Sequence, residues 1–157
     1  MNTAKLRAVI NALDTDKRAH SSIQMMIYLA DWKNALSNAC QITDIEWISG
    51  IRSPSTDADR QPLMNFIATD RAAEPSSIID SVIGFFTRKP VSKPIAPLND
   101  QELASIHHVN NVVKDLSFSD LVTLVYSTRP ILTSNRYTNK YIDLIAHATE
   151  QNKEAQA

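Results

Sequence analysis

"MMIYLADW", residues 25–32, lies within a long helical pattern that extends from about Arg18 to Ala39. Apolar residues recur at three- and four-residue spacing, which places their side chains on one face of a helix. That face is wide and comprises Ile23, Met26, Ile27, Leu29, Ala30 and Leu36. The remaining polar positions form a narrow stripe of Gln24, Tyr28, Asp31 and Asn38. We therefore predict a core-forming helix with Tyr28 and Asp31 on its hydrophilic side.

Length and composition suit one domain. The chain has 157 residues, of which 43% are hydrophobic and 21% charged, and its net charge is −1. So small a net charge gives no global attraction to nucleic acid or to anionic membrane. The single cysteine, Cys40, excludes an internal disulfide and any multi-cysteine metal site. No stretch resembles a signal peptide or a membrane span, so we expect a cytoplasmic protein without a membrane partner.

Glycine is scarce, and its scarcity excludes several classes of enzyme. Gly50 and Gly84 are the only two glycines in the sequence. Neither a GxGxxG dinucleotide fingerprint, nor a phosphate-binding P-loop, nor a GxSxG nucleophile elbow can be formed from them. Few glycines also favour helices over a hairpin-rich β fold.

The segments on either side predict a mainly α (α+β) fold, a compact bundle of about six helices with a small β-strand or hairpin element. Further helices are expected at about 3–13, 59–70 and 137–151, and a strand with a turn over 42–54. Residues 76–89 fit either a short helix or a two-stranded ribbon, and we favour strand. Residues 89–97 hold three prolines and predict an extended connector. Residues 1–150 then form a single domain, and 151–157 a flexible tail.

Two helix starts carry the strongest local signals. Asn99 followed by Glu102, and Ser117 followed by Asp120, each have the spacing of a capping box. Helices are therefore expected to begin near 100 and 118, and the second to end before Pro130. Their close junction resembles a helix-turn-helix, but residues 118–128 are apolar and contain no basic residue, which argues against DNA as a partner.

The histidines and acidic residues of the sequence give little support for a catalytic site or a metal site. The histidines are His20, His107, His108 and His147. Adjacent helical residues point about 100° apart, so His107 and His108 are poorly placed to share a metal, and we predict neither a metal nor a cofactor. A catalytic site at Asp31 and Tyr28 would need a second carboxylate or a histidine that converges on them from elsewhere in the chain. Structural support by Asp31 and Tyr28 is the interpretation that we prefer.

Local basic runs suggest surfaces for a partner. Residues 84–97 and 121–142 contain basic residues, and the second run also has interleaved tyrosines. Arginine and tyrosine are common anchors at protein interfaces, and the mixture also suits RNA. An ordinary solvated surface is the alternative interpretation. With the strand and turn at 42–54, these runs give the candidate partner-binding residues Trp47, Arg52, Arg88, Lys89, Arg129, Arg136 and Tyr137.

Three segments, taken in order, resemble a known family. They are "KLRAVINALD…MMIYLADWKNAL", "ITDIEWISG" and "LNDQEL…VNNVVKDLSFSDLVTLVYSTRPILTS". The Panacea domain, found in SocA-like antitoxins of bacterial and prophage toxin–antitoxin systems, has a similar L-IYLAD run, Thr-containing strand and Ser-Thr-x-Pro helix end. The resemblance covers about residues 1–150. The family's Gly-Pro turn is opened here to Gly50-Ile-Arg-Ser-Pro54, and residues 59–97 match only loosely.

This resemblance implies a protein without enzymatic activity that binds a cognate toxin and neutralises it. Toxins paired with the family are diverse, and several act on translation. Two alternatives stay open: a small nucleotide- or RNA-directed enzyme, and a phage or prophage accessory binding protein without a toxin. Homo-oligomer formation also stays open.

Overall fold

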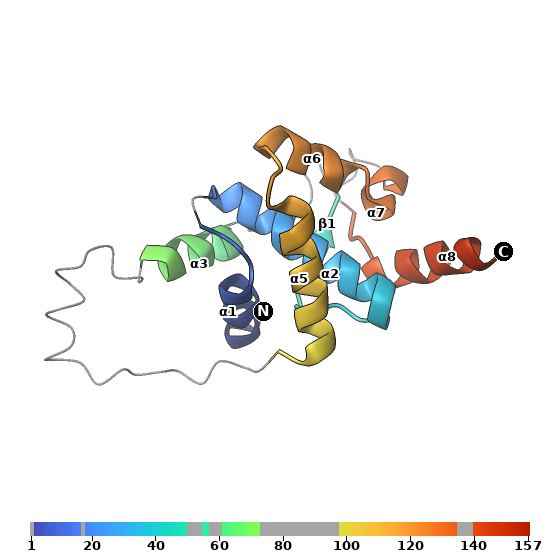
Figure 1. Ribbon diagram of the computed structural model, residues 1–157, viewed down its shortest axis with the longest axis horizontal. Coiled ribbons are helices and arrows are strands. Elements are labelled where there is room, and N and C mark those ends of the chain that lie inside the picture. Colours follow the sequence, from blue (N-terminus) through green and yellow to red (C-terminus); the bar gives the residue numbers. More distant parts are fainter. Residues whose placement is uncertain (1, 17, 50–54, 57–60, 73–97, 135–139) are drawn as a thin grey trace, which may run out of the picture.

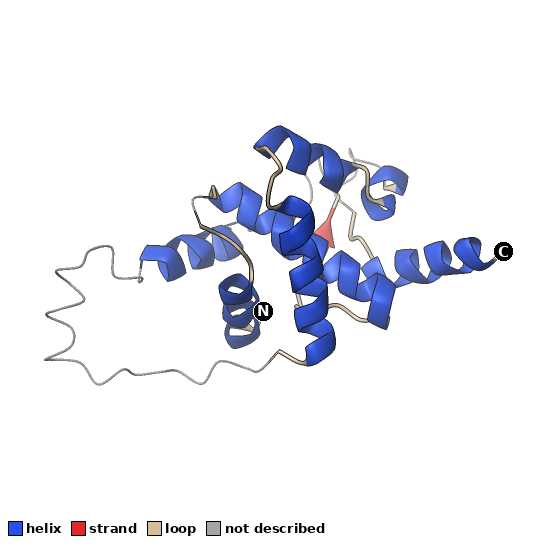
Figure 2. Ribbon diagram, viewed as in Figure 1, coloured by secondary structure: helices blue, strands red, loops and turns tan. Residues whose placement is uncertain are grey.

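The computed structural model describes residues 2–16, 18–49, 55–56, 61–72, 98–134 and 140–157. The fold is mainly helical, as predicted (Figures 1 and 2). Its described helices are α1 (Thr3–Ala12), α2 (His20–Asn38), α3 (Gln61–Ala72), α5 (Asp100–Val113), α6 (Phe118–Tyr126), α7 (Arg129–Thr133) and α8 (Leu144–Gln156). Strands β1 (Trp47–Ile48) and β2 (Ser55–Thr56) pair antiparallel, with Trp47 opposite Thr56. Among the described residues, no helix is both long enough and apolar enough to span a bilayer.

Helix α2 is the centre of the fold. It contacts α1, α3, α5, α6 and α8, and Figure 1 shows α3 and α8 toward opposite ends of the molecule with α2 between them. Its side chains are buried on nearly all sides, which is the pattern of a helix enclosed by others. The predicted core-forming helix is thus confirmed. The predicted hydrophilic stripe is wrong at Tyr28 and Asp31, because both are 0% exposed.

Local sequence signals explain the helix starts. The side chain of Asn2 accepts a hydrogen bond from the backbone N–H of Lys5 and caps α1. Both predicted capping boxes are present, at Asn99 on α5 and at Ser117 on α6. Each satisfies two backbone N–H groups that a helix start would otherwise leave without partners. The predicted helix over 59–70 is present as α3, with Leu63 and Ile67 buried.

The C-terminal helix differs from its prediction at both ends. Residues 140–142 lie beside β1, where the Ile142 N–H donates to the carbonyl of Trp47 at 2.8 Å and Ser49 N–H donates to that of Lys140 at 2.9 Å. Backbone paired in this extended way cannot be helical, so α8 begins at Leu144, capped by Asp143, and not near residue 137. It continues through Gln156, where a tail was predicted.

The segment after α6 forms an additional short helix. As predicted, α6 ends before Pro130, and α7 then starts at Arg129 with the proline in its first turn. Proline is well tolerated there because a first-turn N–H has no partner within the helix. The ribbon or helix expected over 76–89 and the connector over 89–97 lie outside the described residues.

Candidate partner-binding site

Asp31 is a buried hydrogen-bond acceptor that joins α2 to the segment leading into β1. One carboxylate oxygen accepts from the backbone N–H groups of Ile42 and Thr43 at 3.0 and 2.8 Å. The other accepts from the Thr43 hydroxyl at 2.5 Å and from the Trp47 indole N–H at 2.9 Å. Burial raises the pKa of Asp31 to about 6, and these hydrogen bonds oppose the rise. We call Asp31, Ile42, Thr43 and Trp47 the Asp31 cluster.

Tyr28 extends these buried contacts to the C-terminal half of the chain. Its hydroxyl lies 2.9 Å from that of Thr128, which also donates to the carbonyl of Val125 at 2.7 Å. Its ring meets Trp47 edge-on, with ring centroids 5.4 Å apart. Burial also raises the pKa of Tyr28, so its hydroxyl is neutral at physiological pH. Tyr28 and Asp31 therefore act as structural supports, the interpretation preferred from the sequence.

The hypothetical reaction centre is not assembled. In the described part of the chain, Asp31 receives hydrogen bonds from Ile42, Thr43 and Trp47, and no histidine is among its partners. Tyr28 contacts Thr128 and not a group that titrates near neutral pH. Asp31, Tyr28 and a histidine thus do not converge in a cleft, as general acid–base catalysis would require.

The candidate partner-binding residues fall into three groups. Trp47 is 0% exposed and belongs to the Asp31 cluster, so its proposed contact with a partner is wrong: the ring is covered by its own chain. Arg129 is described and partly exposed, on α7. The other candidates, Arg52, Arg88, Lys89, Arg136 and Tyr137, lie outside the described residues.

Arg129 is already engaged within the chain. Its guanidinium donates to both carboxylate oxygens of Glu154, at 2.5 and 2.9 Å, and lies 3.5 Å from Glu150. The hydrogen bonds that Arg129 donates to Glu154, together with the negative charge of Glu154, raise the pKa of Arg129 above its ordinary value. This bidentate ion pair connects α7 to α8. A partner would have to replace Glu154 before it could use Arg129 as an anchor.

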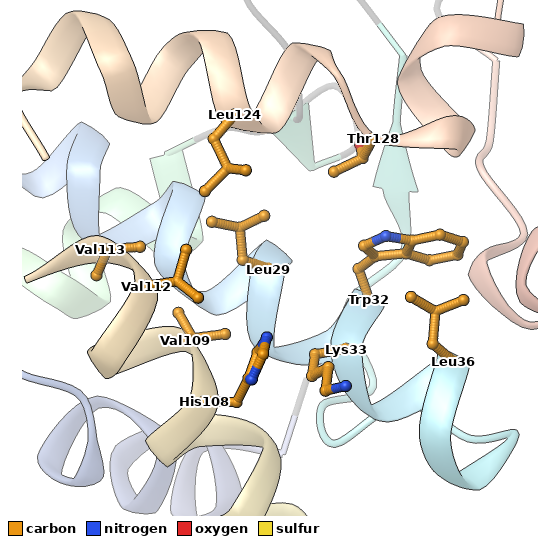
Figure 3. Close-up of a pocket in the computed structure, with 10 residues that line it drawn as sticks. All are labelled: Leu29, Trp32, Lys33, Leu36, His108, Val109, Val112, Val113, Leu124 and Thr128. Atoms are coloured by element: carbon orange, nitrogen blue, oxygen red, sulfur yellow. The ribbon is translucent and has the colours of Figure 1, made fainter.

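An apolar groove of about 240 Å³ lies between α2, α5 and α6 (Figure 3). Helix α2 supplies Leu29, Trp32, Lys33 and Leu36, α5 supplies His108, Val109, Val112 and Val113, and Leu124 and Thr128 close the third side. The contributions of α2 and α5 repeat at helical spacing, so each helix presents one continuous face to the groove. Val112 is 42% exposed, which makes the groove accessible from solvent.

Sequence reasoning missed this groove. Leu29 and Leu36 were assigned to the core with the rest of α2, and Lys33 received no role. A signal was present, since Leu29, Trp32, Lys33 and Leu36 follow the i, i+3, i+4, i+7 pattern of one helix face. This face differs from the one formed by Ile23, Met26 and Ile27. Only the placement of α5 and α6 shows that neighbouring helices leave it partly uncovered.

Comparison with protein-family models, with curated proteins and with solved structures found no match in any of the three. The interpretation of the groove and of the Asp31 cluster therefore depends on the geometry of this chain.

Proposed function

We propose that this chain is an antitoxin that binds a cognate protein toxin directly and neutralises it. The resemblance of three segments to the Panacea domain suggests this function. One structural observation supports the proposal: buried hydrogen bonds join the first of these segments to each of the other two. Asp31 of the first segment accepts from Thr43 and Trp47 of the second, and Tyr28 of the first contacts Thr128 of the third.

These contacts give the order of the motifs a physical meaning. Residues 28 and 128 are 100 positions apart, and residues 31 and 47 are 16 apart. A buried polar group destabilises the fold unless it is hydrogen-bonded, so the residue type at each of these positions restricts which residue types can lie opposite it. The motifs that carry the resemblance thus belong to one buried scaffold, and a shared scaffold is what a family of toxin-binding proteins would have in common.

The groove supplies a surface on which such a protein can act. It is lined mainly by apolar side chains between three helices, of which Val112 is exposed and Leu36 and Leu124 are partly exposed. Apolar area removed from water drives most protein association, and helix-lined apolar grooves recur where proteins bind one another's helices. An antitoxin needs only such a contact, placed so that the bound toxin is inactive.

Two other functions remain as alternatives. An accessory binding protein without a toxin would use the same groove and differs from an antitoxin only in its partner. A nucleotide- or RNA-directed enzyme would need reactive groups other than Asp31 and Tyr28, because the hydrogen bonds of both side chains are made inside the fold.

A growth experiment tests the proposal. Each open reading frame that flanks the gene at its native locus is induced in a bacterial host, first alone and then together with this chain. We expect one neighbour to arrest growth alone and the chain to restore it. The substitution Lys114→Ala, at an exposed position outside the groove, serves as a control that should still restore growth. Harmless neighbours, or arrest that the chain does not relieve, would overturn the proposal.

A further inference from the structure

The groove between α2, α5 and α6 has an uneven distribution of charge. Seven of its ten lining residues are apolar, and the only ionisable ones are Lys33 and His108. In the view of Figure 3 both lie at the end of the groove opposite Leu124 and Thr128. Among the residues that the structure describes, no carboxylate lines the groove. It therefore combines an apolar floor with one end that carries positive charge.

Lys33 and His108 have no side-chain partner among the residues that the structure describes. Two other cations of the fold are engaged: Lys5 lies 2.6 Å from Glu102, and Arg129 is held by Glu154. Lys33 is half-buried at the edge of an apolar surface, where a carboxylate would be attracted more strongly than in open solvent. Charge complementarity thus calls for an acidic group at this end.

The size of the groove indicates what presents that acidic group. Pockets for small molecules usually measure about 300–1,000 Å³, and this groove, at about 240 Å³, is smaller. It suits a few side chains from a segment that continues beyond the groove.

From these observations we propose that the groove binds a partner segment whose apolar side chains lie beside a carboxylate, with that carboxylate seated on Lys33 and His108. This proposal deepens the proposed function, since the segment would belong to the toxin. Lys33 then sets which segments are accepted, because a basic or neutral group at the same position would leave its charge without a counter-ion. Val112, at the exposed wall, contributes to the apolar contact.

The proposal can be tested without knowledge of the toxin. Two capped tripeptides serve as probes, N-acetyl-Leu-Leu-Glu-amide and its Gln counterpart, each titrated into the ¹⁵N-labelled full chain and followed by NMR. We expect amide shifts in α2, α5 and α6 around the groove. The Glu probe should bind about threefold to fivefold more tightly than the Gln probe, which is the upper end of the range for a partly exposed ion pair.

Variants separate the roles of charge and apolar contact. Lys33→Glu should invert the preference and make the Gln probe the tighter one, whereas Lys114→Glu, an exposed lysine outside the groove, should leave it unchanged. Val112→Asp should weaken both probes by about tenfold, and Leu132→Asp, 61% exposed on α7, should weaken neither. The proposal is overturned by equal affinity for the two probes, by shifts confined to other surfaces, or by no shift at millimolar concentration.

Failure of this proposal can be distinguished from failure of the proposed function. If the probes bind as expected but no neighbouring gene is toxic in the growth experiment, the groove proposal stands and the antitoxin function is excluded. Neutralisation of a toxin without selective binding of the Glu probe would retain that function and place the contact elsewhere. In a purified complex with the toxin, Lys33→Glu should weaken binding where Lys114→Glu does not.

Discussion

Substitution of Asp31 by alanine tests the Asp31 cluster. The change removes the acceptor of four hydrogen bonds. The Thr43 hydroxyl can turn to another acceptor, but two backbone N–H groups and the Trp47 indole N–H would be left without a partner. A buried donor without a partner costs about 1–3 kcal/mol, so the three together cost roughly 3–9 kcal/mol. Relief from burying the Asp31 charge, together with entry of water, offsets part of this cost. We expect a net loss of about 3 kcal/mol.

Urea unfolding at pH 7.5, followed by far-UV circular dichroism, measures this loss. A domain of this size has roughly 5–15 kcal/mol of stability in total, so the midpoint should fall clearly. Asp44→Ala is the matched control: Asp44 is exposed and accepts from the backbone N–H of Asn2, and its loss should cost less than about 1 kcal/mol. If Asp31→Ala were no more destabilising than Asp44→Ala, the role assigned to the cluster would be refuted.

Three further predictions concern stability, each measured by urea unfolding. Burial raises the pKa of Asp31 from its ordinary 3.8 to about 6, so its contribution to stability is present below about pH 4 and lost as pH rises through 6. From pH 4 to 7 the wild type should therefore lose about 2 kcal/mol of stability relative to Asp31→Asn, and parallel pH profiles would contradict this. Ala39 ends α2 with φ of 54°, so Ala39→Gly should stabilise the fold by about 0.5–1 kcal/mol, and destabilisation would show that the left-handed conformation carries little strain. Asn99→Ala removes the capping box of α5 and should cost about 1 kcal/mol, whereas an unchanged midpoint would mean that packing alone fixes this helix start.

The elements that sequence predicted well are those fixed by neighbours in the chain. The boxes at Asn99 and Ser117 require only residues three positions apart, and both are present. The apolar spacing along α2 likewise depends on a few turns of one helix, and it identified the central helix of the core. Local periodicity and capping therefore predicted which segments are helical.

The misassigned positions depend on contacts between distant segments. Asp31 is polar and falls on the less hydrophobic side of α2, so periodicity alone assigned it to solvent. It is buried because Thr43 and Trp47 bring donors to it. Tyr141 was predicted to lie on a helix, but pairing of its segment with β1 keeps it extended. Neither the burial of Asp31 nor the extended backbone at Tyr141 can be predicted from the sequence of a single helix or strand.

The groove could be predicted only in part. Leu29, Trp32, Lys33 and Leu36 share one helix face, and this pattern is present in the sequence. Whether that face is covered depends on where α5 and α6 lie, which follows from the packing of helices that are far apart in the chain. That Lys33 has no side-chain partner in the described part of the chain is likewise a property of the assembled fold.

The proposed function depends on direct binding between this chain and a toxin, which can be measured with the two purified proteins. The product of the neighbouring gene that arrests growth is mixed with this chain, and the complex is followed by calorimetry and by size-exclusion chromatography with light scattering. We predict a complex of fixed stoichiometry in which the toxin loses activity in proportion to the chain added. Restored growth in cells without any complex between the purified proteins would contradict direct neutralisation.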